Sequence, residues 1–406
     1  MSTVERSVLH EPERGAGTGA HHQETGTDVE KNAVAGNPSS PTAKTVGPNN
    51  LPDANPKLQP VPPLKGLSFL DRFLVLWILL AMAIGILLGH FVPSTGPSLQ
   101  RGQFVGVSLP IAIGLLVMMY PILCKVRFET LHLLLRERKL WIHLAMSFVL
   151  NWILAPMLMC ALAWAFLPDR PDLRQGLIFV GIARCIAMVL IWTDLAGGDG
   201  DYCAVLVAFN SILQIILFAP FAVFYIEVVS HSYETVDVDY STVATSVAVF
   251  LGIPLAAAVI TRLGLRSLLG ERRYQLCFIR WVAPWSLIGL IFTIIVLFAS
   301  QGEHVVTQIT SVLRVCAPLV VYFAIMFTGT VFLCRKFGFG YRVSCTQSFT
   351  AASNNFELAI AVVVAVYGAG GGQALASTVG PLIEVPVLVL LVYVMKYLGK
   401  RWGWEA

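Results

Sequence analysis

The chain has 406 residues and a formal net charge of +4; 56% of its residues are hydrophobic, 13% are charged, and its mean hydropathy is +0.72. About a quarter of the residues in a typical soluble domain are charged, so this composition excludes a soluble globular protein and indicates an integral membrane protein with the lipid bilayer as a partner. The positive charge lies in loops between apolar runs, and nothing in it indicates nucleic acid binding. The eight cysteines form no C-x-x-C pair and no Cys/His cluster, so we expect no metal site, no cofactor and no disulfide framework.

Residues 1–64 differ in composition from the rest of the chain. They are rich in Gly, Pro, Thr and Asn and contain no aromatic residue. Such a segment buries too little apolar surface to offset the entropy lost on ordering. It also lacks an apolar run that would serve as a secretory signal. We therefore predict a disordered, cytoplasmic N-terminal tail.

Ten apolar runs of roughly twenty residues follow, which is the length that an α-helix needs to cross a bilayer. Lys and Arg gather in alternate loops, such as 125–139 and 262–280. Because cytoplasmic loops accumulate basic residues, we expect both termini in the cytoplasm and place the protein in the plasma membrane, with an internal membrane left open. The predicted spans are 71–92, 104–124, 140–167, 174–195, 202–228, 242–262, 279–300, 309–333, 342–368 and 374–396.

The ten spans divide into two groups of five. An odd number of spans makes the second group enter the membrane from the opposite side, which is the arithmetic of an inverted repeat. We therefore predict an all-α membrane protein with a first five-helix repeat at 65–232 and a second, inverted five-helix repeat at 233–406.

The fourth and ninth spans carry polar residues at mid-span. Arg184 and Cys185 interrupt the fourth, while 353–355 and Glu357 interrupt the ninth. Polar and ionisable groups are costly in hydrocarbon and mark substrate or ion pathways. An unwound turn must satisfy its backbone groups inside the protein, so we predict two discontinuous helices that cross and share a substrate site. The alternative is that small residues permit close packing and the amides supply hydrogen bonds between helices.

Several motifs also carry a resemblance to a known family. They are NWILAPMLM from Asn151, ARCIAMVLIWTDLAGGD, VAFNSILQ around Asn210, SFTAASNNFELAIAV, and VGPLIEVPVL around Glu384. In this order the chain resembles the arsenite efflux permeases of the arsenical resistance-3 family, in the bile/arsenite/riboflavin transporter superfamily, from about residue 68 to residue 398. The resemblance implies ten transmembrane helices in two inverted repeats with crossed, broken fourth and ninth helices. It also implies extrusion of trivalent arsenic in exchange for protons, with Cys185 and Glu357 as functional residues.

The chemistry of arsenous acid agrees with a site at Cys185. The acid is neutral, with three hydroxyls and a soft arsenic centre, and soft centres prefer sulfur ligands. A single thiolate permits release, whereas three would hold arsenic too tightly for transport. Arg184 either stabilises the thiolate and orients the arsenic oxygens or pairs with a carboxylate elsewhere, since adjacent helical residues point in different directions.

Five further polar residues are assigned to substrate binding. For Asn151 and Asn210, hydrogen bonds to the hydroxyls and bridges between helices remain equally open. The full set is Asn151, Asn210, Ser353, Asn354 and Asn355.

Two acidic residues are assigned to proton coupling. Burial disfavours the ionised carboxylate, so Glu357 is expected to take a proton from outside and release it to the cytoplasm. Protonated Glu357 and bound metalloid are expected to exclude each other, which couples the two flows. Glu384, flanked by Pro381 and Pro386, has either a second protonation or gating role or a structural pairing with Arg184.

Three other functions compete with this hypothesis. A sodium-coupled symporter of organic anions, similar to bile acid transporters, has the same architecture, and the turn at 353–355 has oxygens suited to sodium; it has no need of a thiol. A membrane enzyme is disfavoured because the chain has no H-E-x-x-H, no Ser/His/Asp set and no nucleotide-binding loop. A receptor or sensor fits ten spans less well than alternating access does. The sequence leaves open antimonite transport, proton stoichiometry and a homodimer.

Overall fold

The computed structural model describes residues 73–92, 94–99, 101–126, 128, 138–186, 188–230 and 238–404. The predicted tail, 1–64, lies outside these residues. Helices make up 86% of the structure. In the described part, five helical segments are long and apolar enough to cross a bilayer, and three shorter apolar helices accompany them. These observations confirm an all-α membrane protein. The long segments are Leu140–Phe166, Gly200–Val229, Tyr240–Ser300, Ile309–Lys336 and Gly372–Arg401, and the shorter helices are Leu76–Phe91, Leu109–Cys124 and Phe356–Tyr367.

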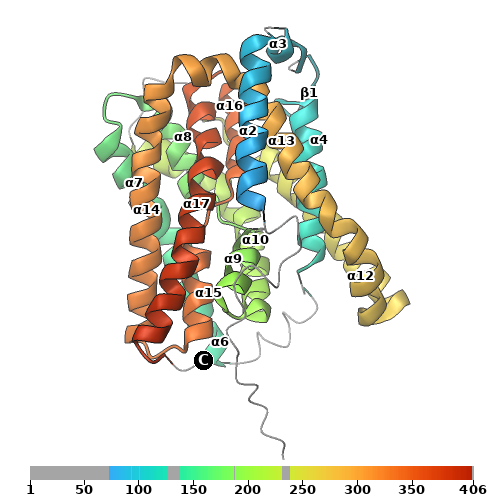
Figure 1. The fold of residues 1–406 in the computed structure, drawn as a ribbon, viewed down its shortest axis with the longest axis vertical. Coiled ribbons are helices and arrows are strands. Elements are labelled where there is room, and N and C mark those ends of the chain that lie inside the picture. The colour runs from blue at the N-terminus through green and yellow to red at the C-terminus, as the bar shows by residue number, and fades with distance from the viewer. Residues whose placement is uncertain are drawn as a thin grey trace, which may run out of the picture. The chain divides into compact units, whose positions relative to one another are not determined.

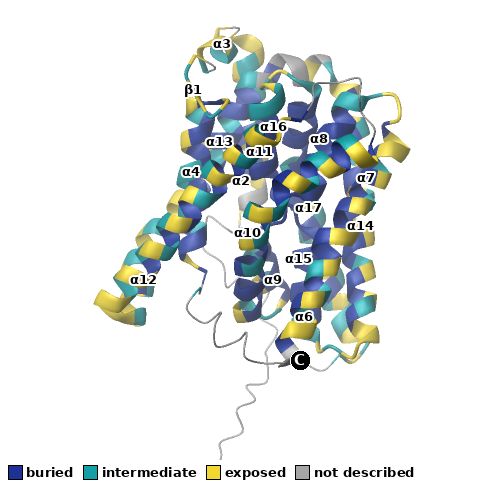
Figure 2. Ribbon diagram, turned by 180° about the vertical axis from the view of Figure 1, so that it is seen from behind, coloured by how far each residue is buried: buried dark blue, intermediate teal, exposed yellow. Residues whose placement is uncertain are grey.

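One group of helices packs around α13 (Arg280–Thr307), which lies against α2 (Leu74–Phe91) and α4 (Leu109–Cys124) (Figure 1). The close approach depends on glycine, because a Cβ added to Gly89 would lie 2.5 Å from the carbonyl oxygen of Ala299. Helix α12 (Ile253–Arg273) packs along α4 and extends beyond its end, where its outer surface is exposed (Figure 2).

The segment before α4 differs from the prediction. Residues 104–108 were expected inside the second span, but they form an antiparallel hairpin of β1 (Gln103–Phe104) and β2 (Val107–Ser108), preceded by α3 (Thr95–Leu99). The two turn residues Val105 and Gly106 both have positive φ, 53° and 75°, as a type I′ turn requires. The turn therefore delays the start of the helix to Leu109.

The junction of the sixth and seventh spans also differs from the prediction. A connection was expected at 262–280, and the helix does break there, at Gly270; the rest of this range is helical and not a loop, and the π-helical segment Tyr274–Ile279 leads into α13. Arg and Leu are good helix formers, and the change of direction is confined to Gly270, whose φ of +75° suits glycine.

The remaining helices enclose two broken helices. The fourth span consists of α8 (Pro171–Ile182) and α9 (Met188–Ala196), and the ninth consists of α15 (Tyr341–Ala352) and α16 (Phe356–Tyr367). Most residues of α8 and α15 are buried (Figure 2). The surrounding helices are α6 (Arg138–Phe148), α7 (Ala155–Phe166), α10 (Gly200–Val223), α11 (Tyr240–Val247), α14 (Ile309–Lys336) and α17 (Gly372–Arg401), with π-helical segments Val149–Leu154, Phe224–Val229 and Ala248–Gly252.

Candidate functional site

The breaks in the two discontinuous helices lie against each other. An antiparallel β-bridge pairs Arg184 with Asn354, and the backbone N–H of Asn355 donates to the carbonyl oxygen of Ala183 at 3.1 Å. The fourth and ninth spans therefore meet through extended backbone, at the mid-span residues that the sequence singled out.

The break in the ninth span caps the end of α8. The last carbonyl groups of a helix have no partner in the helix itself, and the N–H of Arg184, the usual partner of Val180 O, donates instead to Oε1 of Gln214 at 2.5 Å. The side-chain amide of Asn354 replaces it, donating from Nδ2 to Val180 O at 2.7 Å and to Ala183 O at 3.3 Å. Each break therefore depends on the other for its hydrogen bonds.

Two residues of the ninth-span break stabilise its own helix ends. The hydroxyl of Ser353 donates to Phe349 O at 2.6 Å, in the last turn of α15. Asn355 caps the N-terminus of α16, because its Oδ1 accepts from the N–H of Leu358 at 3.1 Å. Both have structural roles, which leave the hydroxyl oxygen of Ser353 and the amide nitrogen of Asn355 for other partners.

The predicted metalloid-binding pair lies in the break between α8 and α9. Cys185 is 2% exposed and Arg184 is fully buried. The guanidinium of Arg184 donates from Nη1 to the hydroxyl of Tyr322 at 3.1 Å and from Nη2 to Gly181 O. Within the described residues it forms no ion pair with a carboxylate, so the pairing with Glu384 weighed above is not the arrangement observed.

The two acidic residues occupy different positions near the crossing. Oε1 of Glu384 accepts from the backbone N–H of Asn354 at 3.2 Å, and Glu384 is 4% exposed. Glu357 lies in the first turn of α16, where a helix dipole favours negative charge, and remains partly exposed between buried neighbours. Glu357 lies close enough to Glu384 for their negative charges to repel each other. In the described part of the chain, no group of three His, Cys, Asp or Glu side chains is placed to hold a metal.

Asn151 and Asn210 are both fully buried, outside the two broken helices. Asn151 lies in the π-helical segment Val149–Leu154, and its Nδ2 donates to Ser147 O at 2.8 Å. Asn210 lies on α10, and its Oδ1 accepts from the indole N–H of Trp152 at 3.1 Å. Of the two interpretations left open, Asn210 thus bridges two segments, whereas Asn151 bonds to Ser147 of α6, in the helical run that its own segment continues.

Three residues at the site were not singled out by the sequence. Gln214, Tyr322 and Trp152 are fully buried and hydrogen-bonded to Arg184 or Asn210. A signal existed for Gln214, because it lies four residues after Asn210 and therefore on the same face of a helix.

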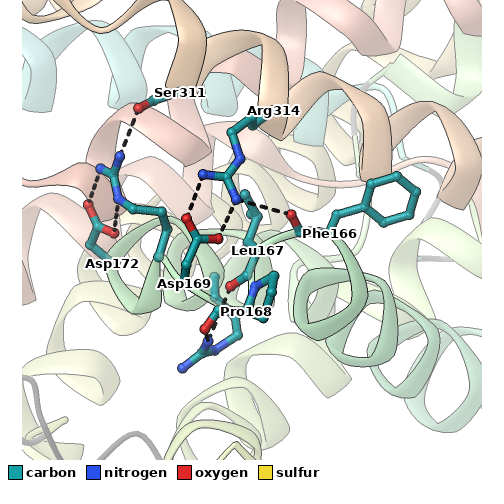
Figure 3. Close-up of polar contacts among 9 residues, drawn as sticks. Phe166, Leu167, Pro168, Asp169, Asp172, Ser311 and Arg314 are labelled. Atoms are coloured by element: carbon teal, nitrogen blue, oxygen red, sulfur yellow. Dashed lines mark hydrogen bonds and ion pairs between the residues drawn. The ribbon is translucent and has the colours of Figure 1, made fainter.

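A polar cluster fastens the start of α8 to α14 (Figure 3). Arg314 of α14 binds both carboxylate oxygens of Asp169, and Arg170 binds Asp172 at 2.8 Å and the hydroxyl of Ser311 at 3.0 Å. The hydrogen bonds from Arg314 lower the pKa of Asp169 from 3.8 to about 2. The cluster thereby anchors the half-helix that ends at the site.

Comparison with known proteins identifies the family. The chain is 47% identical to the arsenical-resistance protein Acr3 of Corynebacterium glutamicum over 339 residues, which cover 82% of this chain and 91% of the relative. It is 29% identical to Acr3 of Alkaliphilus metalliredigens over 338 residues, covering 81% and 92%. An uncharacterized transporter of Synechocystis, slr0944, is 32% identical over 349 residues, covering 81% and 89%.

The comparison with family models agrees with these relatives. The sodium bile acid symporter family matches residues 112–308, a range that includes the break between α8 and α9. Both comparisons indicate a transporter and not an enzyme. The chain belongs to the family of the arsenical-resistance protein Acr3.

Proposed function

We propose that this protein exports trivalent arsenic, as arsenite, across the plasma membrane in exchange for protons and thereby confers arsenic resistance. One observation carries the proposal: the thiol-bearing Cys185 is buried at the meeting point of two broken helices. The relatives named for arsenical resistance support the choice of substrate.

The proposed scaffold has ten transmembrane helices in two inverted repeats, 65–232 and 233–406, with both termini in the cytoplasm. The breaks support it, since each falls in the fourth span of its repeat. The 61-residue helical run Tyr240–Ser300 supports two crossings, because at about 1.5 Å per residue it is far longer than one crossing requires.

Substrate recognition in this proposal combines one soft ligand with hydrogen bonds. The sulfur of Cys185 contacts arsenic, while buried amides beside it bind the hydroxyls. Arg184 holds its place through Tyr322 and Gly181, so the neutral substrate meets a cation whose position is fixed.

Proton coupling is assigned to Glu357, with Glu384 as the second carboxyl. Two neighbouring carboxylates repel each other and disfavour double ionisation, and the buried Glu384 already accepts a hydrogen bond from the backbone N–H of Asn354. A proton gained or lost by this pair therefore changes the charge next to Asn354, the residue of the ninth-span break that pairs with Arg184.

The decisive experiment is arsenite uptake into everted membrane vesicles under an imposed pH gradient, with sodium present and absent. Uptake that follows the pH gradient in both conditions is expected. Uptake that requires sodium and ignores the pH gradient would replace proton exchange with sodium coupling.

The thiol is tested by Cys185→Ser, which should reduce arsenite export because oxygen is a poor ligand for a soft centre. The matched control is Cys277→Ser, since Cys277 is exposed and lies far along the chain in Tyr274–Ile279. Equal export by the two variants at equal membrane levels would remove Cys185 from the site.

The carboxyl is tested by Glu357→Gln, which should abolish uphill export because an amide cannot carry the proton. Arsenite counterflow, which needs no proton gradient, should persist in the same vesicles. A Gln variant that still accumulates arsenite uphill at the wild-type rate would exclude Glu357 as the proton carrier.

The second candidate is a sodium-coupled symporter of organic anions. The match of residues 112–308 to the sodium bile acid symporter family favours it. The buried thiol of Cys185 gives such a symporter no advantage, and the sodium arm of the vesicle experiment separates the two functions.

A further inference from the structure

Gln214 touches the break in the fourth span from a third helix. It lies on α10, one turn beyond Asn210, and is fully buried. Its Oε1 accepts the backbone N–H of Arg184, the residue that precedes Cys185. Gln214 therefore lies directly beside the proposed arsenic ligand.

The chemistry of this contact fixes the orientation of the Gln214 amide. A backbone N–H is only a donor, so the group that faces it must be the amide oxygen. The nitrogen, Nε2, then points elsewhere, and it has no hydrogen-bond partner among the described residues. A buried amide donor without an acceptor is unfavourable. Nε2 of Gln214 is therefore suited to donate to an oxygen atom of a bound ligand.

Two other amides are oriented in the same way. Oδ1 of Asn210 accepts from the indole N–H of Trp152, and Oδ1 of Asn355 accepts from the backbone N–H of Leu358. Each oxygen faces an obligate donor, and each Nδ2 is left without a partner in the part of the chain that the structure describes. Gln214 and Asn355 each contact the break in the fourth span, and Asn210 lies one helical turn before Gln214 on α10.

We propose that Gln214 binds the substrate directly, by donating a hydrogen bond from Nε2 to a hydroxyl oxygen of the trivalent arsenic species at Cys185. This inference rests on the proposed function. The oxygens of a neutral arsenic hydroxide accept such bonds, and amide donors recognise them without the ion pair that would retain a charged ligand. Asn210 and Asn355 supply the companion donors.

Two substitutions separate the roles of the two amide atoms. Gln214→Glu keeps an oxygen for the Arg184 N–H and replaces the NH₂ group, whereas Gln214→Met removes both functions at similar volume. Gln347→Met is the matched control, because Gln347 is equally buried but its Nε2 already donates to His143 O and to the hydroxyl of Tyr202.

The measurement is protection of Cys185 by arsenite against alkylation in the purified full-length protein, followed peptide by peptide with mass spectrometry. Loss of one hydrogen bond should raise the arsenite concentration for half-protection roughly 3- to 10-fold in both Gln214 variants, with no change in the control. For Gln214→Glu the loss should deepen as the buffer becomes more alkaline, since only the protonated carboxyl can donate.

The outcomes distinguish this inference from the proposed function. If arsenite fails to protect Cys185 in the wild-type protein, the proposed site itself is wrong. If the wild type is protected and Gln214→Glu has the same half-protection concentration at every pH, Gln214 only holds the Arg184 peptide and the inference is overturned. If Gln214→Met fails to fold, Gln214→Glu alone decides between these results.

Discussion

Replacement of Asn354 by alanine tests whether the two breaks stabilise each other. In Asn354→Ala, the carbonyl oxygen of Val180 loses the hydrogen bond from Nδ2 of Asn354, which stands in for the missing helical N–H. The carbonyl oxygen of Ala183 loses a second bond from Nδ2 and keeps the one from the N–H of Asn355. An unsatisfied buried carbonyl costs about 1–3 kcal/mol and an ordinary hydrogen bond contributes about 0.5–1.5 kcal/mol, so the variant should lose about 2–4 kcal/mol of folding free energy.

Thermal unfolding of the detergent-purified protein measures this loss, with a thiol-reactive dye reporting exposure of buried cysteines such as Cys203 and Cys345. The midpoint should fall by roughly 3–6 °C, because the unfolding entropy of a chain of this length is about 0.7 kcal/mol/K. Asn151→Ala is the matched control, because Asn151 is equally buried but its Nδ2 donates only to Ser147 of the preceding turn. Equal shifts in the two variants would refute the mutual capping of the breaks.

Two further predictions concern packing and acid stability. Gly380→Ala should destabilise the protein by about 1–3 kcal/mol through overpacking, because the added Cβ would lie 1.7 Å from the ring of Phe356. Gly329→Ala is the control and should be tolerated in the same unfolding assay, because no atom lies within 4 Å of its added Cβ. Equal stability of the two variants would contradict the close packing at Gly380. The pKa of Asp169 is lowered from 3.8 to about 2 by Arg314, and a lowered carboxyl pKa stabilises the fold above the unfolded value and loses that effect as pH falls through the folded one. The unfolding midpoint of Arg314→Gln should therefore decline less than that of the wild type between about pH 4 and about pH 2, and parallel declines would exclude the contribution of this pair.

The breaks in the fourth and ninth spans were predictable because their signal is local. Polar residues at Arg184 and at 353–355 stand in apolar runs, and the cost of burying them marks the positions directly. The junction near Gly270 was not predictable in the same way. Positive charge indicated a loop, but charge density does not separate a loop from a helix that extends beyond the bilayer.

The positions of the two breaks were easier to predict than the hydrogen-bond partners of the residues in them. Substrate binding by Asn354 and Asn355 stays a prediction, but the sequence did not indicate that Nδ2 of Asn354 donates to α8 or that Oδ1 of Asn355 caps α16. Gln214 was missed, although its oxygen is bonded to the residue before Cys185. Such roles depend on which backbone groups a break leaves without partners, and these are set by the partner helix instead of by local sequence.

The mutual capping also restricts how the site can move. Separation of the breaks would leave Val180 O without Asn354 and Ala183 O without Asn355, and in a protein interior neither carbonyl has water as a substitute. A transport cycle that keeps these bonds must move Cys185 and Glu357 together, as one body, past the helices around α13. Thiol and carboxyl would then stay at a constant separation throughout the cycle, and the proposed exchange of a proton for arsenite would depend on which of the two occupies the site and not on relative motion of the two breaks.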